Sequence, residues 1–159
     1  MNLDFLRHAD ALVGMADEVR PLSPQGRVEA RALGQFLKRA GVRFDRAYCS
    51  PLLRARQTAE LVLAGGDGPV GGALVEDALR NETSQDVFER WLTSLEGVHH
   101  ALLVGHAPTL AARVRKLLGF DRDNTLELST GGLVCVTMMG KNRARLVFFV
   151  SPAWLGKGD

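Results

Sequence analysis

Two arginines and two histidines in this sequence have side chains that could bind and attack a phosphate group. Arg7 and His8 directly follow a mostly apolar stretch. Arg54 comes four residues after Ser50, and His106 follows a second apolar stretch. Guanidinium groups bind phosphoryl oxygens through paired N–H donors, and a neutral imidazole can attack phosphorus with one ring nitrogen. The motifs therefore predict an anion site in which either histidine could be the nucleophile.

The segments between these motifs alternate between strand-like and helix-like patterns. Apolar runs predict strands at residues 2–6, 44–49, 73–75, 101–104, 133–139 and 144–150. Helical periodicity predicts helices at residues 24–40, 51–64, 87–95 and 108–118. This alternation implies an α/β fold, a mostly parallel central sheet with helices on both faces and a C-terminal strand pair. Ligands in such sheets bind at the carboxyl ends of the strands, which is where the four cationic residues fall.

A serine followed by proline predicts the start of two of these helices. Ser23-Pro24 and Ser50-Pro51 both combine an N-cap residue with a proline at the first helical position. Gly41 is the predicted end of the helix that begins at Pro24, and Val28 belongs to the apolar side of that helix.

Composition limits the kind of protein. The 159 residues are 46% hydrophobic and 24% charged, which predicts a single globular domain over residues 1–159. A formal charge of +2 gives no reason to expect a nucleic acid or membrane partner, and no apolar run reaches the roughly 18 residues of a membrane span. The first residues do not form a signal peptide, and two cysteines are too few for a disulfide framework, so we expect a cytoplasmic protein.

The motifs, taken in order, resemble the histidine phosphatase superfamily. The matching segments are Arg7-His8-Ala9, then Ser50-Pro51-Leu52-Leu53-Arg54-Ala55-Arg56-Gln57-Thr58, then Gly105-His106. The resemblance extends to the small bacterial SixA-type phosphohistidine phosphatases and covers essentially the whole chain. The segments that carry this second resemblance are Arg20-Pro21-Leu22-Ser23-Pro24, His106-Ala107-Pro108 and Ser151-Pro152-Ala153-Trp154-Leu155.

The resemblance implies roles for the cationic residues. His8 would be the nucleophile that becomes phosphorylated, while Arg7, Arg54 and His106 would hold the phosphoryl oxygens. Arg20 would approach the substrate. The implied substrate is a protein carrying phosphohistidine, with phosphate or another oxyanion in the site. No cofactor and no metal are expected, since protein groups supply the positive charge.

Two positions depart from the family pattern. Ala9 replaces the usual glycine, and Asn81 stands where ester-hydrolysing members carry a glutamate, with Glu82 beside it. A phosphate ester has an alkoxide leaving group that needs a proton, whereas imidazole leaves from phosphohistidine more readily. The second departure therefore favours phosphohistidine, and Glu82 and Asp77 remain candidates for a general acid.

Three other functions remain open. The same His8 could serve a phosphatase of small phosphate esters or of phosphoserine and phosphothreonine proteins, or the chain could be a non-catalytic phosphate-binding module. A cysteine phosphatase is disfavoured, because four residues separate Cys49 from Arg54 where that chemistry needs five.

Several neighbouring residues have expected structural roles. We expect Gln57 and Thr58 to brace the site by hydrogen bonds, and the acidic residues of the first loop, Asp17 among them, to be solvated. His99 and His100 are expected to be exposed, and as neighbours on an extended chain they make a poor metal-binding pair.

Overall fold

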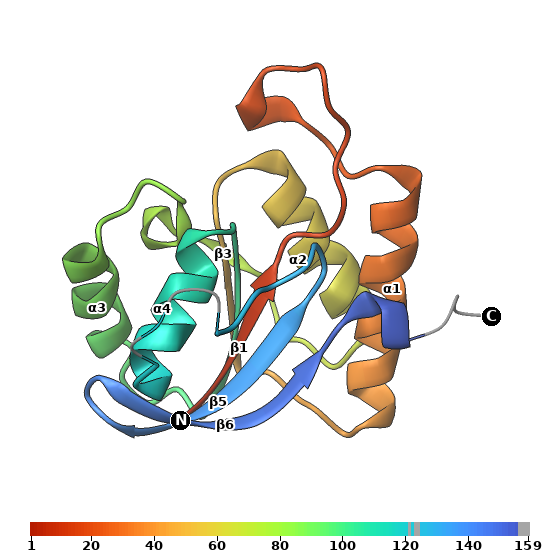
Figure 1. The fold of residues 1–159 in the computed structure, drawn as a ribbon. Helices are drawn as coiled ribbons and strands as arrows, with labels where there is room; N and C mark the ends of the chain where they lie inside the picture. The colour runs from red at the N-terminus through yellow and green to blue at the C-terminus, as the bar shows by residue number, and fades with distance from the viewer. Residues whose placement is uncertain (121, 123–124, 156–159) are drawn as a thin grey trace.

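A single six-stranded sheet, in the order β3-β2-β4-β1-β5-β6, organises the protein in the computed structural model (Figure 1). The structure describes residues 1–120, 122 and 125–155. The strands are β1 (Asn2–Arg7), β2 (Arg46–Cys49), β3 (Leu74–Val75), β4 (His100–Gly105), β5 (Leu133–Gly140) and β6 (Arg143–Val150). The helices are α1 (Pro24–Arg39), α2 (Leu53–Gly65), α3 (Gln85–Thr93) and α4 (Thr109–Leu118). Short 3-10 helices lie at Asp17–Val19, Asp77–Leu79 and Pro152–Trp154.

The pairing of the strands confirms the predicted fold class. Strands β1, β2, β3 and β4 run parallel, and β5 and β6 add an antiparallel pair beside β1. The prediction that residues 1–159 form one domain includes residues 121, 123, 124 and 156–159, which lie outside the described residues. It stays a prediction.

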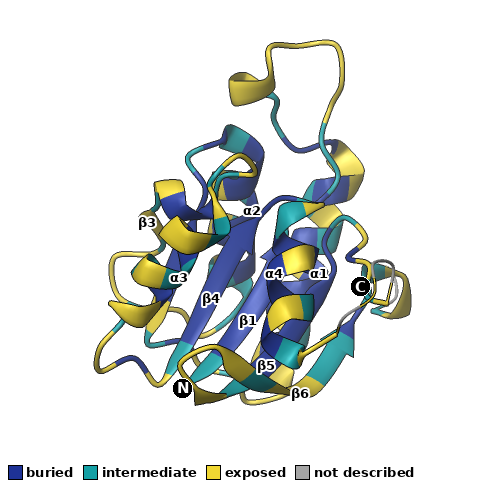
Figure 2. Ribbon diagram, turned by 60° about the vertical axis from the view of Figure 1, so that its left-hand side comes forward, coloured by how far each residue is buried: buried dark blue, intermediate teal, exposed yellow. Residues whose placement is uncertain are grey.

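Two apolar layers cover the sheet, one on each face. In β4, Ala101 and Leu103 pack against α3 and α4, while Leu102 and Val104 pack against α1 and α2. All four side chains are fully buried, as expected for a central strand of a parallel sheet (Figure 2). The continuous apolar run of β4 therefore reflects burial on both faces and makes the middle of the sheet a rigid support. None of the helices among the described residues has the length and apolar character needed to cross a membrane.

The two predicted serine caps have different outcomes. The Ser23 hydroxyl accepts the backbone N–H of Gly26 at 3.0 Å and caps α1, as predicted, although Val28 on this helix is exposed. The prediction for Ser50-Pro51 was wrong, because α2 begins at Leu53 and has no side-chain cap. Ser50 is fully buried and its hydroxyl contacts His106 instead.

The carboxyl ends of β1 and β4 lie side by side and fix the chain just beyond them. Arg7 pairs with Gly105 in the register, and the His8 N–H donates to the Gly105 carbonyl at 3.0 Å. The long loop of residues 9–22 then stands above this edge of the sheet (Figure 1). The loop can lie close to α1 because Gly26 has no side chain, since a Cβ there would collide with the Asp10 backbone.

Candidate active site

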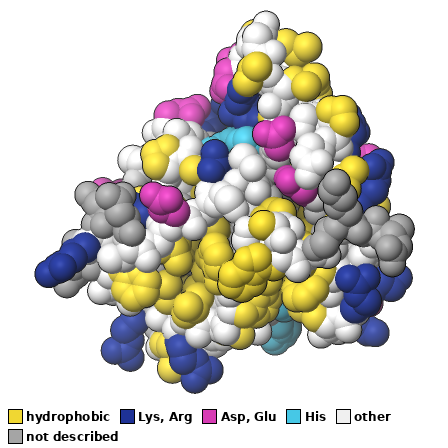
Figure 3. Space-filling model, turned by 45° about the vertical axis from the view of Figure 1, so that its right-hand side comes forward, with side chains coloured by type: hydrophobic (Ala, Val, Ile, Leu, Met, Phe, Trp, Pro, Cys, Tyr) yellow, Lys and Arg dark blue, Asp and Glu magenta, His cyan; other side chains and the backbone are white. Residues whose placement is uncertain are grey.

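All the predicted cationic site residues line one cavity at the carboxyl ends of the strands. Its volume is about 520 Å³. The predicted residues on its wall are Arg7, His8, Arg20, Arg54, Glu82 and His106. On the surface, histidine atoms are visible at the bottom of a hollow ringed by basic and acidic side chains (Figure 3). The sequence motifs thus converge on one site, as the alternation of strands and helices predicts.

His8 is held in one tautomer. Its Nδ1 lies 2.8 Å from the Ala9 carbonyl, which can only accept a hydrogen bond, so Nδ1 carries the proton. The other ring nitrogen, Nε2, accepts a hydrogen bond from Arg54 Nε at 3.2 Å. The pKa of His8 is lowered to about 4, mainly by burial and also by the charges of Arg54 and Arg7, against the opposing effect of the Ala9 carbonyl. At neutral pH the ring is therefore uncharged and has its lone pair on Nε2.

His106 lies beside His8 in a different environment. The two ring centroids are 5.1 Å apart, and His106 Nε2 lies 2.7 Å from the Ser50 hydroxyl. Its Nδ1 has no hydrogen-bond partner among the residues that the structure describes. Burial lowers the pKa of His106 to about 3, with smaller contributions from His8 and Arg54. The Ser50 hydroxyl can donate to Nε2, and in that arrangement the ring proton is on Nδ1, where it can donate to a phosphoryl oxygen.

The two arginines bring their guanidinium groups to the cavity from different elements. Arg7, the last residue of β1, anchors one terminal nitrogen on the Leu128 carbonyl at 2.8 Å, and its buried Nε has no partner among the described residues. Arg54, in the first turn of α2, is 6% exposed. These anchored groups form a cationic wall around His8, which suits a group with several negative oxygens.

Asp17 is a site residue for which the sequence analysis named no partner. It is exposed, as expected for a solvated residue, and its carboxylate also lies 3.2 Å from Arg54 Nη2 and 3.3 Å from Arg20 Nε. Its backbone carbonyl accepts a hydrogen bond from Arg54 Nη1 at 2.7 Å. Burial acts to raise the pKa of Asp17, but the hydrogen bond and charge of Arg54 outweigh it, so the pKa lies below its ordinary value. An ionised carboxylate thus occupies donors of Arg54 that would serve a phosphoryl group.

Replacing Asp17 with asparagine should therefore strengthen anion binding. We expect the inhibition constant of inorganic phosphate to fall several-fold in Asp17→Asn, because the phosphate no longer displaces a negative charge from Arg54. Competitive inhibition assays at constant ionic strength measure this. Glu18→Gln is the matched control, since Glu18 belongs to the same 3-10 helix but does not line the cavity. An unchanged or higher constant in Asp17→Asn would mean that Asp17 orients Arg54 and does not compete with phosphate.

Gln57 and Thr58 brace the site as predicted. The Thr58 hydroxyl accepts the Ala9 N–H at 3.0 Å and donates to the Arg54 carbonyl at 2.7 Å. Gln57 Oε1 accepts the Leu22 N–H at 2.8 Å at the far end of the loop. Helix α2 therefore holds both the backbone next to His8 and the end of the loop that carries Asp17.

The structure distinguishes between the two candidates for a general acid. Glu82 lines the cavity and lies 3.5 Å from Arg80, whereas Asp77 is paired with Arg80 at 2.6 Å and does not line the cavity. Asn81 also lines the cavity, and its Oδ1 accepts the N–H of Thr109 at 3.3 Å at the start of α4. Glu82 is thus the carboxylate of this loop that can reach a substrate.

Cys49 does not have the surroundings of a catalytic cysteine. It is buried and does not line the cavity that holds Arg54. Burial raises the pKa of its thiol to about 11, so it is protonated at neutral pH. The cysteine-phosphatase alternative is therefore wrong.

Comparison with known proteins identifies relatives with the same architecture. A family profile described as histidine phosphatase superfamily (branch 1) matches residues 7–81. The phosphohistidine phosphatase SixA of Escherichia coli K12 is 34% identical over 122 residues, which cover 74% of this chain and 74% of that protein. A solved structure of the protein histidine phosphatase SixA complexed with tungstate matches with a TM-score of 0.88 and 29% identity, over 96% of this chain and 98% of its own. The mitochondrial serine/threonine-protein phosphatase Pgam5 of Drosophila virilis is 27% identical over 159 residues, covering 79% of this chain and 53% of its own length.

Proposed function

The chain belongs to the histidine phosphatase superfamily and is a phosphohydrolase, and we propose from this premise that it removes phosphoryl groups from phosphohistidine on a protein. The observation that carries the proposal is the tautomer of His8, whose Nδ1–H is bound to the Ala9 carbonyl and whose Nε2 is free of a proton. This nitrogen is a nucleophile at the bottom of a cationic cavity. The similarity to phosphohistidine phosphatase SixA supports the substrate class.

In the first step, His8 Nε2 attacks the phosphorus of the substrate. A bond forms between Nε2 and phosphorus, and the bond from phosphorus to the substrate imidazole breaks. The substrate ring takes the electron pair of that bond and leaves as neutral imidazole when its other nitrogen carries a proton. His8 is then a phosphoimidazolium, and the Ala9 carbonyl stabilises the positive ring through Nδ1–H.

In the second step, water attacks the phosphorus of phospho-His8 from the side opposite Nε2. The Nε2–phosphorus bond breaks, its electron pair returns to Nε2, and phosphate leaves with the oxygen and protons of water. His8 regains the neutral tautomer of the free enzyme without moving the Nδ1 proton. The fixed proton therefore makes Nε2 a nucleophile in one step and a leaving group in the next.

Charge neutralisation is assigned to protein groups. Arg7, Arg54 and His106 hold the three equatorial oxygens of the phosphoryl group while it is transferred. Arg20 approaches the substrate from the loop of residues 9–22. Arg7 is anchored in advance on the Leu128 carbonyl, whereas Arg54 must exchange its contact with the Asp17 carboxylate for the phosphoryl oxygens. We propose that the reaction needs neither a cofactor nor a metal ion, and the cytoplasmic location expected from the cysteine count stays a prediction.

Hydrolysis of phosphate esters, including phosphoserine and phosphothreonine, is the alternative, and Glu82 is the observation that favours it. Glu82 lines the cavity and could protonate an alkoxide, and the similarity to Pgam5 is compatible with such a substrate. Its carboxylate is nevertheless exposed and pairs with Arg80 at 3.5 Å, not with a residue that holds the phosphoryl group. Phosphohistidine, which makes the smaller demand on an acid, therefore suits this loop better.

A comparison of two substrates in the presence of EDTA tests the proposal. We expect wild-type protein to release phosphate from a chemically phosphorylated histidine protein much faster than from a phosphoserine peptide. Glu82→Gln should leave the phosphohistidine rate within about twofold, because no strong acid is needed. Glu60→Gln makes the same charge change outside the cavity and is the control. Faster release from the phosphoserine peptide, with a large loss in Glu82→Gln, would favour the ester phosphatase; binding without turnover would favour a phosphate-binding module.

A further inference from the structure

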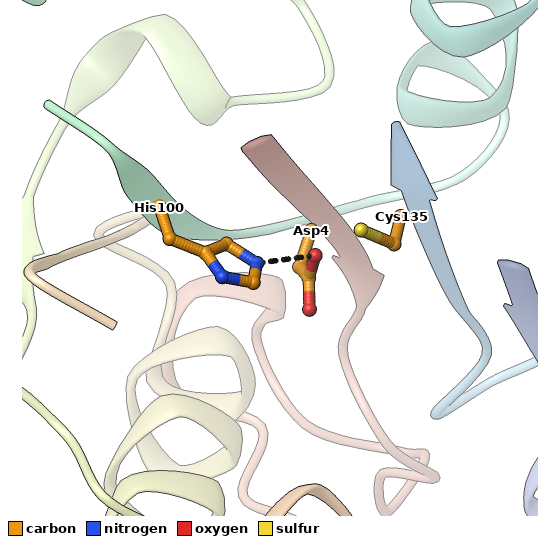
Figure 4. Close-up of side chains that lie close together, drawn as sticks. All are labelled: Asp4, His100 and Cys135. Carbon is orange, nitrogen blue, oxygen red and sulfur yellow. Dashed lines mark hydrogen bonds and ion pairs between the residues drawn. The ribbon is translucent and has the colours of Figure 1, made fainter. Parts of the chain in front are cut away.

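Three potential metal ligands meet on one face of the sheet, away from the phosphoryl site. Asp4 on β1, His100 at the start of β4 and Cys135 on β5 offer one ligand atom each, all within 4.8 Å of one another. Their side chains point toward a common volume (Figure 4). The sequence analysis expected His100 to be exposed, and this was wrong: its ring is half-buried, and Nε2 lies 2.9 Å from Asp4 Oδ1. His99 is exposed, as expected.

The register of the strands explains why these residues meet. Asp4 and Cys135 are direct cross-strand partners, and Leu102 is the partner of Asp4 on the other side. His100 lies two positions before Leu102 on the same strand and so faces the same side of the sheet. Three adjacent strands therefore present one ligand atom each, and strand backbones hold all three.

The surroundings of Asp4 leave part of its buried carboxylate without a hydrogen bond. Asp4 is fully buried, and Cys135 is 2% exposed. One carboxylate oxygen contacts His100, but the other, Oδ2, is buried without a hydrogen-bond partner among the described residues. A carboxylate oxygen withdrawn from water without a partner is unfavourable, and native proteins rarely leave one so. The Asp4 carboxylate also contacts the Cys135 thiol, and burial together with this carboxylate raises the pKa of that thiol. A ligand shared by Asp4 and Cys135 would therefore take the place of the thiol proton and use a lone pair of the carboxylate.

We propose that Asp4, His100 and Cys135 form a binding site for a divalent transition metal ion of the zinc type. Thiolate, imidazole and carboxylate are the donors that Zn²⁺ and Co²⁺ take in tetrahedral sites. The charges balance, because the carboxylate of Asp4 and the thiolate of Cys135 together neutralise a dication at this buried position. Water supplies the fourth ligand from the side of His100, whose side chain is 19% exposed.

Binding needs only a small adjustment of the side chains. In a tetrahedral zinc site neighbouring ligand atoms are about 3.3–3.8 Å apart, and the present spread of the three atoms is at most 4.8 Å. On binding, the proton between His100 Nε2 and Asp4 Oδ1 moves to His100 Nδ1, and the Cys135 thiol releases its proton to solvent. No redox change is involved.

The site would stabilise the sheet without taking part in catalysis. Asp4 precedes His8 by four residues on an extended strand, a separation of roughly 13 Å. A metal ion bound to Asp4 would link β1 to both of its neighbours, β4 and β5. Binding to the folded state alone raises the melting temperature as the free metal concentration rises. The experiment can therefore be read without any activity measurement.

Titration of EDTA-treated, reduced full-length protein with Co²⁺ tests the site. We expect one equivalent to bind with a thiolate-to-cobalt charge-transfer band in the near ultraviolet. The band should disappear in Cys135→Ala and remain in Cys49→Ala, the matched control that removes the other buried thiol. His100→Gln is a second variant at a half-buried position, and it should weaken Co²⁺ binding at least tenfold.

Thermal unfolding gives an independent second measurement. One equivalent of Zn²⁺ should raise the melting temperature of wild type and Cys49→Ala, but not of Cys135→Ala or His100→Gln. Absence of the band in wild type, its persistence in Cys135→Ala or its loss in Cys49→Ala would each overturn the proposal. These outcomes do not depend on whether phosphohistidine is the substrate.

Discussion

Replacing His8 with alanine is expected to lower phosphate release from a phosphohistidine protein by at least about 10⁴-fold, the order seen when a catalytic nucleophile is removed. The physical reason is that Nε2 of His8 is the nitrogen whose lone pair is held unprotonated in the cavity. The remaining cationic groups can still bind phosphate but have no atom to transfer it to. Single-turnover phosphate release measures the loss, and acid-labile, base-stable phosphoprotein measures the intermediate.

Two further variants identify which histidine forms the intermediate. His99→Ala changes an exposed histidine outside the cavity and should behave like wild type. His106→Ala should slow turnover while the chain can still be labelled, because His106 is assigned to holding an oxygen. Labelled protein in His8→Ala, or loss of all labelling in His106→Ala with normal phosphate binding, would transfer the nucleophile role to His106.

Replacing Arg54 with alanine is expected to lower kcat/KM by about 10²–10³-fold, the usual effect of losing one strong donor to a charged transition state. Arg54 donates Nε–H to His8 and has two terminal nitrogens near the site, so one substitution removes both the orientation of the ring and a charged fork. Arg54→Lys should recover little, because the single nitrogen of an ammonium group lacks the planar fork whose separate nitrogens reach His8 and the phosphoryl group together. Steady-state kinetics on the phosphohistidine protein measure both variants.

The matched control for this series lies two residues further along the same helix. Arg56 is exposed, does not line the cavity, and Arg56→Ala removes the same charge from α2. Its kcat/KM should stay within about twofold of wild type, because an exposed charge outside the cavity is screened by solvent. Full activity in Arg54→Lys would show that net charge alone is required and would contradict the fork that we assign to Arg54.

Much of the fold follows from patterns that are local in the sequence. The apolar run of β4 predicts a strand buried on both faces, and Ser23-Pro24 predicts the start of α1. Such patterns depend on residues that are close together in the chain, so they can be recognised without knowledge of the tertiary structure. The order of the strands and helices then places Arg7, His8, Arg54 and His106 at one edge of the sheet, and the structure brings these four residues together in one cavity.

The contacts that the sequence analysis missed join residues far apart in the chain. Ser50 has the local signature of a helix cap, but its hydroxyl lies within hydrogen-bond distance of His106, 56 residues away. Asp17 has the composition of a solvated loop residue, but it is paired with Arg54, 37 residues away. A local pattern cannot reveal such a partner, because each contact depends on how the fold brings together residues that are far apart in the chain.

Residue type, periodicity and order along the chain were sufficient to predict the family, the α/β fold class and the four cationic residues of the cavity. How those residues can act depends on their arrangement in the folded protein. The Ala9 carbonyl gives His8 its tautomer through backbone geometry, and strand register brings Asp4, His100 and Cys135 together from three strands. Both results depend on the angles and distances between groups, and those exist only once the chain has folded.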